Sequence, residues 1–201
     1  IQDVMVSMLS DKTMMLPEMG EGARLLAQSG FNVIASANLR DRGVHEMSSA
    51  LKRRFNFETV KPIRDHGFEV ELVMQQLQRE LDAIGAAVIV RRDVVELLVT
   101  TFQELRAGQT REGTAIKTPE AVMSSAEAVN LVYAASLEAL HFGDGTLRPR
   151  ELANQLQGVV LKDNADDLKR VRHYFDTVVR ERGRRDDLWK SFGDAARQLW
   201  L

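Results

Sequence analysis

An uncharged amide follows an apolar segment near the start of the chain. Residues 32–37 carry Val33, Ile34 and Ala35 and are followed directly by Asn38. A segment that is apolar on both faces is typical of a central parallel strand, and ligands bind at the carboxyl edge of such sheets. An asparagine there can orient a water molecule or a phosphate oxygen, although asparagine also favours turns. Asn38 is therefore a candidate catalytic and cofactor-binding residue, with a simple turn as the alternative.

Three consecutive cations form a second candidate site. Lys52, Arg53 and Arg54 lie in the sequence SSALKRRFNFE, between a short predicted helix and the next predicted strand. An arginine guanidinium is always charged, and its rigid donor fork matches the geometry of phosphate. Such an arginine, presented outward, can reach the nucleotide of a neighbouring subunit. A solvated basic face, or a surface that attracts nucleic acid, would explain the same residues.

Other common sites are not indicated. His45, His66, His141 and His173 do not have metal-ligand spacing, and the chain has no cysteine. The sequence has no G-x-S-x-G, H-E-x-x-H or Walker A motif. We therefore expect no metal site in these residues.

Composition is that of an ordinary globular protein. The 201 residues are 44% hydrophobic and 28% charged, with a net charge of -2. Such a charge gives no general attraction to nucleic acid or to a membrane surface. No apolar run approaches the roughly 20 residues of a membrane span.

The first part of the chain predicts an incomplete α/β layer. We expect a helix over residues 1–9, a hairpin or loop over residues 10–30, strands over residues 32–37 and 55–60, and a short helix over residues 47–52. Two strands do not make a stable sheet alone. The chain also begins with Ile1 within a helical pattern. We take both observations to indicate a piece of a longer protein.

From residue 65 onward the pattern is helical throughout. Apolar residues recur at helical spacing, and Gly108, the sequence FGDGT and Gly183 end successive helices. We expect Asp93, Thr118 and Asn164 to cap three of these helices, with Pro119 in the first turn of the second. The predicted domains are therefore an α/β part, 1–64, and an all-α part, 65–201, in a predominantly helical chain.

The order of these segments resembles the second half of an AAA+ ATPase module of the MoxR-like group. In that family a helix and a hairpin insert precede a strand similar to F-x-V-I-A-T-x-N, which this chain matches as FNVIASAN. A segment similar to A-L-x-x-R-F-x-F follows, matched by ALKRRFNF, and then a helical lid. The resemblance covers residues 1–62 closely, whereas the lid matches mainly in its helical character.

The resemblance implies roles for individual residues. Asn38 matches sensor 1, which positions the attacking water, and Arg54 matches the arginine finger, with Arg53 as the adjacent alternative. The lid's sensor 2 arginine is expected near the start of a lid helix. The sequence TPEA places Glu120 there instead, and Arg148 or Arg150 are substitutes suggested only by their charge.

The resemblance also implies the context of the site. It implies bound ATP and Mg²⁺ in the full-length protein, a homo-oligomeric ring with six subunits, a chaperone-like or remodelling role and a cytoplasmic location. The Walker A and B elements are expected before Ile1, so we expect these residues alone neither to bind ATP tightly nor to hydrolyse it. The hairpin near residues 14–22 is where contact with a substrate is expected.

Two other functions remain open at this point. A helical interaction module with a degenerate ATPase remnant would explain Glu120 in place of an arginine. A DNA-remodelling AAA+ protein would explain the basic runs at residues 52–54 and 180–185, but Asp186 and Asp187 directly follow the second run.

Overall fold

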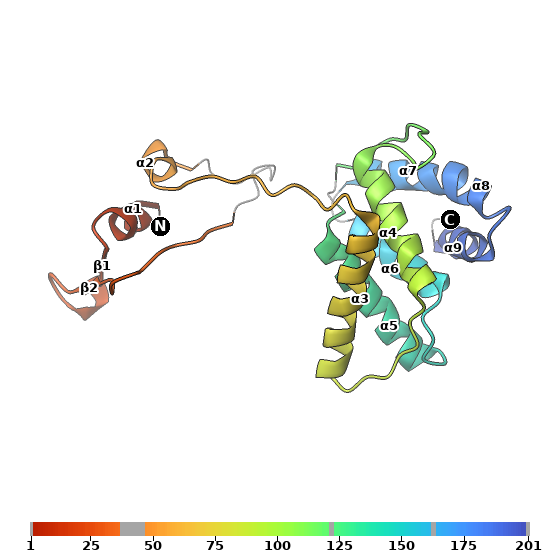
Figure 1. The fold of residues 1–201 in the computed structure, drawn as a ribbon, viewed down its shortest axis with the longest axis horizontal. Coiled ribbons are helices and arrows are strands. Elements are labelled where there is room, and N and C mark those ends of the chain that lie inside the picture. The colour runs from red at the N-terminus through yellow and green to blue at the C-terminus, as the bar shows by residue number, and fades with distance from the viewer. Residues whose placement is uncertain (1, 37–46, 121–122, 162–163, 200–201) are drawn as a thin grey trace. The chain divides into compact units, whose positions relative to one another are not determined.

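The computed structural model describes residues 2–36, 47–120, 123–161 and 164–199. The chain forms two units, residues 1–60 and residues 61–201 (Figure 1). The predicted boundary between residues 64 and 65 stays a prediction. No helix in the described ranges is long and apolar enough to cross a membrane.

The described part of the first unit contains two short helices and one hairpin. Helix α1 (Gln2–Ser10) leads into strand β1 (Thr13–Met15), which pairs antiparallel with β2 (Arg24–Leu26). A 3-10 turn, η1 (Pro17–Met19), lies between the strands, and helix α2 (Ser49–Lys52) follows later in the chain. The predicted helix at residues 1–9, the hairpin and the short helix at residues 47–52 are confirmed.

The two predicted strands of the α/β layer are not formed in the described residues. Residues 32–36 and 56–60 are extended without strand pairing, and Ile34 and Val60 are 97% and 91% exposed. A strand is held by hydrogen bonds to a neighbouring strand, and no described segment supplies one here. The amide of Val33 donates to Oδ1 of Asn32, at 2.9 Å, and not to a neighbouring strand.

In the described residues the second unit consists of helices joined by loops, with two isolated β-bridges. The helices are α3 (His66–Ala83), α4 (Arg92–Ala107), α5 (Ser125–Phe142), α6 (Pro149–Leu161), α7 (Ala165–Tyr174), α8 (Arg180–Arg182) and α9 (Asp187–Leu199), with the π-helical turn η2 (Phe175–Val179) between α7 and α8. The predominantly helical character predicted from the sequence is confirmed.

One apolar core holds the second unit together. Helix α3 packs against α4 and α5, α5 packs against α6, and α6 packs against α7 and α9 (Figure 1). The largest fully buried side chains include Leu77, Leu81, Leu98, Phe102, Leu105, Leu131, Leu152, Leu156, Tyr174 and Phe192. These residues come from α3, α4, α5, α6, α7 and α9, so the core depends on all of these helices.

Two predicted helix starts are wrong, and one is confirmed. Helix α4 begins after Arg91, so Asp93 lies within its first turn and does not cap it. Helix α5 begins after Ser124 and not at Thr118, because Ser124 and Glu127 form a complete capping box. Asn164 caps α7, as predicted, by accepting from the amide of Asp166 at 2.9 Å.

Candidate functional site

The basic residues at the end of α2 are positioned by a capped and anchored helix. The side chain of Ser48 accepts a hydrogen bond from the amide of Leu51 at 3.3 Å, which begins the helix. Leu51 is 3% exposed and anchors it in the unit. Arg53 then ends the helix and Arg54 follows it, and both side chains lie on the surface.

Arg54 is held by neutral groups. Its Nη1 donates to the carbonyl oxygen of Ala50 at 2.6 Å, and its Nε donates to Oγ of Ser10 in α1. Within the described residues neither Arg53 nor Arg54 forms an ion pair. No described carboxylate therefore compensates the positive charge of this corner, which suits it to bind an anion.

Asn38 lies outside the described residues. The structure therefore places Arg53 and Arg54 next to one another but does not test the predicted approach of Asn38 to a phosphate. The catalytic roles of all three residues stay predictions.

Glu120 does not lie at the start of a lid helix. Its amide donates to Oδ1 of Asp167 at 2.7 Å, and this contact fixes it in the segment before α5. The acidic residue in the first turn of α5 is Glu127, whose carboxylate accepts from the amide of Ser124 at 2.7 Å. The sequence motif that suggested Glu120 depended on the wrong helix start.

The suggested substitutes, Arg148 and Arg150, are both neutralised. Arg148 donates to the two carboxylate oxygens of Asp144, at 2.8 and 2.6 Å, and these bonds hold the pKa of Asp144 well below its usual range. Arg150 donates to Oε1 of Glu151 at 2.7 and 3.1 Å. Each guanidinium is therefore paired with a carboxylate.

A buried ion pair that the sequence reasoning missed fixes the start of α5. Glu69 is fully buried, and both of its oxygens accept from Nη2 of Arg106, at 2.7 and 3.0 Å. Gln103 and Ser125 donate to the same carboxylate at 2.6 Å each. Nη1 of Arg106 also donates to the carbonyl oxygen of Met123 at 2.9 Å. Helices α3, α4 and α5 are therefore joined at one point.

A second buried carboxylate joins α4 to α7 and α8. Glu104 is 3% exposed and accepts from Arg182 at 2.7 and 3.0 Å, from the hydroxyl of Tyr174 at 2.7 Å and from the amide of Arg111 at 2.8 Å. Burial and the Glu104 charge raise the pKa of Tyr174 well above its usual value. Oε2 of Glu112 also accepts a hydrogen bond from Nη2 of Arg182, at 2.8 Å.

A sequence signal for these two carboxylates existed. Glu104 lies seven residues after Leu97, on the apolar face of its helix, and Glu69 directly precedes Val70 in the apolar stripe of α3. A charged residue on a buried face needs a partner. The pattern does not identify the partners, because Arg106 and Arg182 come from elsewhere in the fold.

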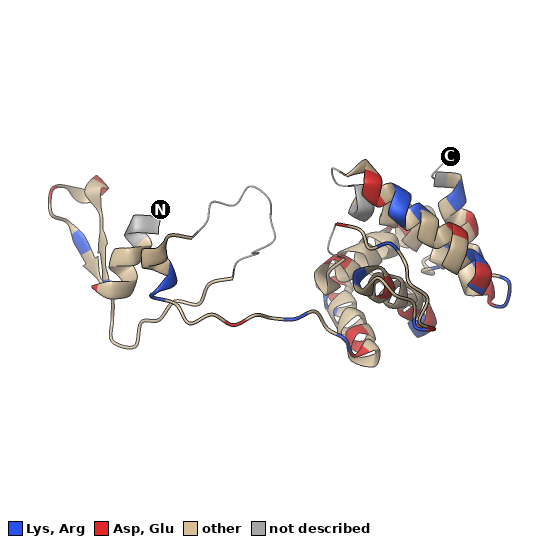
Figure 2. Cartoon of the chain, turned by 90° about the horizontal axis from the view of Figure 1, so that it is seen from above, with Lys and Arg blue, Asp and Glu red and all other residues tan. Residues whose placement is uncertain are grey.

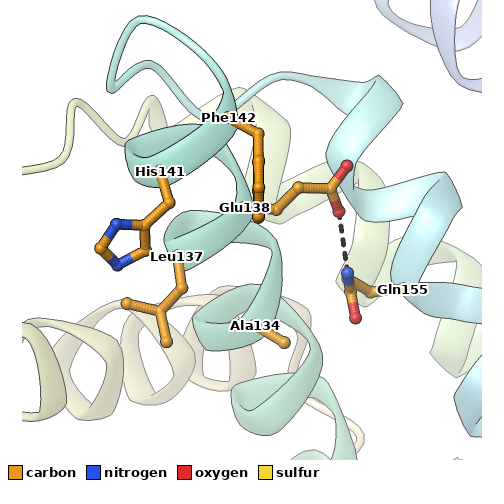
Figure 3. A pocket seen from close by; sticks show the side chains of 6 residues that line it. All are labelled: Ala134, Leu137, Glu138, His141, Phe142 and Gln155. Carbon is orange, nitrogen blue, oxygen red and sulfur yellow. Dashed lines mark hydrogen bonds between the residues drawn. The ribbon is translucent and has the colours of Figure 1, made fainter.

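An open groove of about 520 Å³ lies along α5 and α6 (Figure 3). Glu138 in this groove accepts from Nε2 of Gln155 at 2.8 Å, and the imidazole of His141 points away from that pair (Figure 3). This arrangement has no acid and base placed to work together. The described residues also hold no group of three metal-ligating side chains.

Comparisons with known proteins agree with this division of the chain. Residues 1–55 match the AAA domain of the dynein-related subfamily, and residues 67–199 match the YehL-like AAA+ ATPase C-terminal domain. The class of protein is therefore that of the AAA+ ATPases. The match to the C-terminal domain covers more than half of the chain, and the chain belongs to the YehL-like AAA+ family.

One curated relative is the uncharacterized protein YehL of Escherichia coli (strain K12). It is 43% identical to this chain over 200 residues, which are 99% of this chain and 54% of the relative. The chain thus spans about half the length of that relative. No solved structure matches the chain.

Proposed function

We propose that this chain supplies the sensor 1 residue, the arginine finger and the lid of an ATP-hydrolysing AAA+ protein of MoxR-like type. The observation that carries the proposal is the position of Arg54, at the end of a capped helix, with its charge not compensated by any described carboxylate. Belonging to the YehL-like AAA+ family supports the same conclusion.

The chemistry of phosphoryl transfer explains why these residue types are needed. Negative charge spreads over the oxygens of the transferred γ-phosphoryl group, and an arginine stabilises it in the transition state. Arg54 has this role in the proposal, and Arg53 is the adjacent alternative. Asn38 orients the attacking water. ATP and Mg²⁺ are held by residues outside this chain.

An arginine finger that acts on a neighbour requires an assembly. The proposed assembly is a homo-oligomeric ring of six subunits in the cytoplasm, in which Arg54 of one subunit reaches the ATP of the next. In the full-length protein, residues 32–37 and 55–60 join the α/β sheet. ATP-driven movement of the lid then gives a chaperone-like, remodelling action on client proteins.

The test of the arginine finger uses the full-length protein. Arg54→Ala is expected to lower the rate of ATP hydrolysis by about 10³-fold or more and to leave ATP affinity nearly unchanged. Arg79→Ala is the matched control, since Arg79 is exposed on α3 and forms no ion pair with a described residue. A normal rate for Arg54→Ala would overturn the assignment, and a loss with Arg53→Ala alone would transfer the role to Arg53.

Subunit mixing tests whether the finger acts between subunits. Arg54→Ala and Asn38→Ala proteins are each expected to bind ATP without hydrolysing it. A mixed ring contains sites in which an intact Asn38 faces an intact Arg54 of its neighbour, so mixing should restore hydrolysis. If the two residues act within one subunit, the mixture stays inactive.

A non-catalytic interaction module derived from an AAA+ ATPase is the second candidate. The acidic first turn of α5 and the neutralised Arg148 and Arg150 favour it, since neither of these two arginines is then free for the nucleotide. Absence of ATP hydrolysis by the full-length protein would support this candidate.

DNA remodelling is less favoured. In the second basic run, Arg184 and Arg185 contact Glu181, and Arg182 is paired with Glu104. If the full-length protein bound random DNA, and if that binding weakened steeply with salt, the result would support DNA remodelling.

A further inference from the structure

The groove along α5 and α6 holds a carboxylate that no described cation neutralises. Glu138 is half-buried there, and its Oε2 accepts a hydrogen bond from Nε2 of Gln155 at 2.8 Å (Figure 3). Its Oε1 accepts another from Nδ2 of Asn154. Glu138 forms no ion pair with a described residue, and the arginine in the first turn of α6, Arg150, is paired with Glu151. Two neutral amides therefore orient the charge of Glu138 without compensating it.

An exposed aromatic ring lies beside this carboxylate. Phe142 follows Glu138 by four residues, and side chains at this spacing share one face of a helix. Phe142 lines the same groove and is 88% exposed. Ala134, four residues before Glu138, and Leu137 continue the lining with aliphatic side chains. The exposed ring alone would not indicate a ligand, but here a carboxylate without a cation lies between it and an aliphatic surface.

The free hydrogen-bonding positions of Glu138 match a guanidinium group. Each oxygen of a carboxylate accepts about two hydrogen bonds. One is already made at each oxygen of Glu138, so each oxygen can accept one more. The parallel N–H groups of a guanidinium can reach both oxygens at once, whereas an ammonium group is a point charge without such a fork. The flat face of the guanidinium can also lie over the ring of Phe142 in a cation–π contact.

Other classes of ligand fit this groove less well. Its lining contains no lysine or arginine, and the imidazole of His141 points away from Glu138, so a phosphate would be repelled (Figure 3). A metal ion needs several ligands, and the described residues hold no group of three suitable side chains. Figure 2 shows acidic and basic positions interspersed on the helices of the second unit. Contacts within the groove, and not a field of one sign over the unit, therefore select the ligand.

We propose that this groove, lined by Ala134, Leu137, Glu138, Phe142 and Gln155, binds an arginine side chain of a partner polypeptide. Glu138 pairs with the guanidinium through both oxygens, and Phe142 covers one of its faces. Because the groove is open and continues along Ala134 and Leu137, it also contacts apolar side chains next to the arginine. The inference does not depend on ATP hydrolysis, since every residue that it uses lies in the second unit.

The test compares the binding of four labelled peptides to the full-length protein by fluorescence anisotropy. All four have leucine on both sides of one central residue, which is arginine, lysine, citrulline or glutamate. Citrulline has nearly the shape of arginine but no charge. We expect the arginine peptide to bind most tightly, the lysine peptide about 3- to 10-fold more weakly, and the other two at least about 10-fold more weakly. Equal binding of the arginine and citrulline peptides, or binding of none, would overturn the proposal.

A competitor tests whether the ligand is a polypeptide. N-acetylarginine amide carries the guanidinium but lacks the leucines that contact Ala134 and Leu137. We expect about 5- to 10-fold more of it than of unlabelled arginine peptide to be needed to displace the labelled peptide. Displacement at equal concentrations would show that the groove takes a small cation, and would overturn the assignment to a polypeptide.

Variants of the groove then assign the contacts. Glu138→Gln keeps the shape of the side chain but removes its charge, and it should weaken binding of the arginine peptide at least about 10-fold. Phe142→Leu stays apolar but lacks the ring, and it should weaken binding about 2- to 5-fold. Glu80→Gln is the matched control and should bind normally, since Glu80 is exposed on α3 and forms no ion pair with a described residue.

The two groove variants keep the proposal open to refutation. Thermal unfolding followed by circular dichroism shows whether Glu138→Gln keeps its fold, and unchanged binding by that variant would refute the charge pairing. Phe142 is exposed, so its replacement should leave the fold intact in any case. Unchanged binding by Phe142→Leu would refute the contact with the ring.

Discussion

Two glutamates of α3, two positions apart, have opposite environments. Glu69 is fully buried against Arg106, whose side chain is 11% exposed, whereas Glu71 and Arg92 are paired at 2.9 Å with side chains that are 69% and 52% exposed. Removing one partner of a buried pair leaves a buried charge without compensation, but an exposed pair contributes little.

We therefore predict that Glu69→Gln lowers the free energy of unfolding by about 3–5 kcal/mol and that Glu71→Gln lowers it by about 1 kcal/mol or less. Urea unfolding of the chain, followed by circular dichroism, measures both values. Similar losses for the two variants would show that burial of Glu69 does not matter in solution.

His66 gives the helical unit a dependence on pH. Its Nε2 lies 3.0 Å from Oγ1 of Thr100, and burial, helped by the charge of Arg111, lowers its pKa, while Glu96 and Glu69 act in the opposite direction. Because the folded pKa is below the unfolded value of about 6.5, the unfolded chain binds the proton first. Stability is thus full above that pH and falls as the pH decreases below it.

We predict that His66→Gln reduces the loss of stability between about pH 7.5 and about pH 5.5. Urea midpoints at the two pH values measure the effect. His173→Gln, which changes an exposed histidine of α7, is the control and should keep the original dependence. An unchanged dependence in the His66→Gln protein would assign it to other groups.

At the scale of the elements, the start of α5 distinguishes the sequence prediction from the structure. Ser124→Ala removes the side chain that accepts from the amide of Glu127 at 3.2 Å, and it should cost about 1 kcal/mol of unfolding free energy. Thr118→Ala should cost clearly less, because Thr118 caps no helix. If the thermal unfolding midpoint fell more for Thr118→Ala, the helix would begin where the sequence suggested.

Helical periodicity was sufficient to predict the longer helices of the second unit, because each of them has apolar residues that the core buries. Local signals misplaced the start of α5, since Thr118 and Pro119 are a good cap sequence and Ser124 with Glu127 is a better one. The sequence pattern could not show whether strands form at residues 32–37 and 55–60, because a strand needs hydrogen bonds to a neighbouring strand. Nor did any pattern join Glu69 to Arg106 or Glu104 to Arg182, which are contacts between helices.

At the scale of the whole molecule, the two units differ in their cores. In the first unit Leu51 is the only buried residue among those whose burial is described, whereas the second unit has a large apolar core. The family matches also divide there, with an AAA domain before residue 56 and the C-terminal domain from residue 67.

We predict that trypsin digests the first unit of the 201-residue chain and leaves a resistant fragment that begins near Asp65. Cleavage after Arg64 is expected because that residue is exposed and lies in an extended segment, whereas residues of packed helices open rarely. Mass spectrometry of the fragments identifies the cut sites. Early cuts within α3, α4 or α5 would contradict the prediction.

The π-helical turn between α7 and α8 constrains how this family can gain or lose residues. It lies between Tyr174 and Arg182, both of which contact Glu104. Each residue of a helix turns it by about 100°, so deleting one residue from η2 would rotate Arg182 away from Glu104 and from the ring of Trp189, 4.7 Å from its guanidinium. A homologue that is one residue shorter at this place must therefore compensate the buried carboxylate in another way. An alignment gap at this place would identify homologues in which a different residue pairs with that carboxylate.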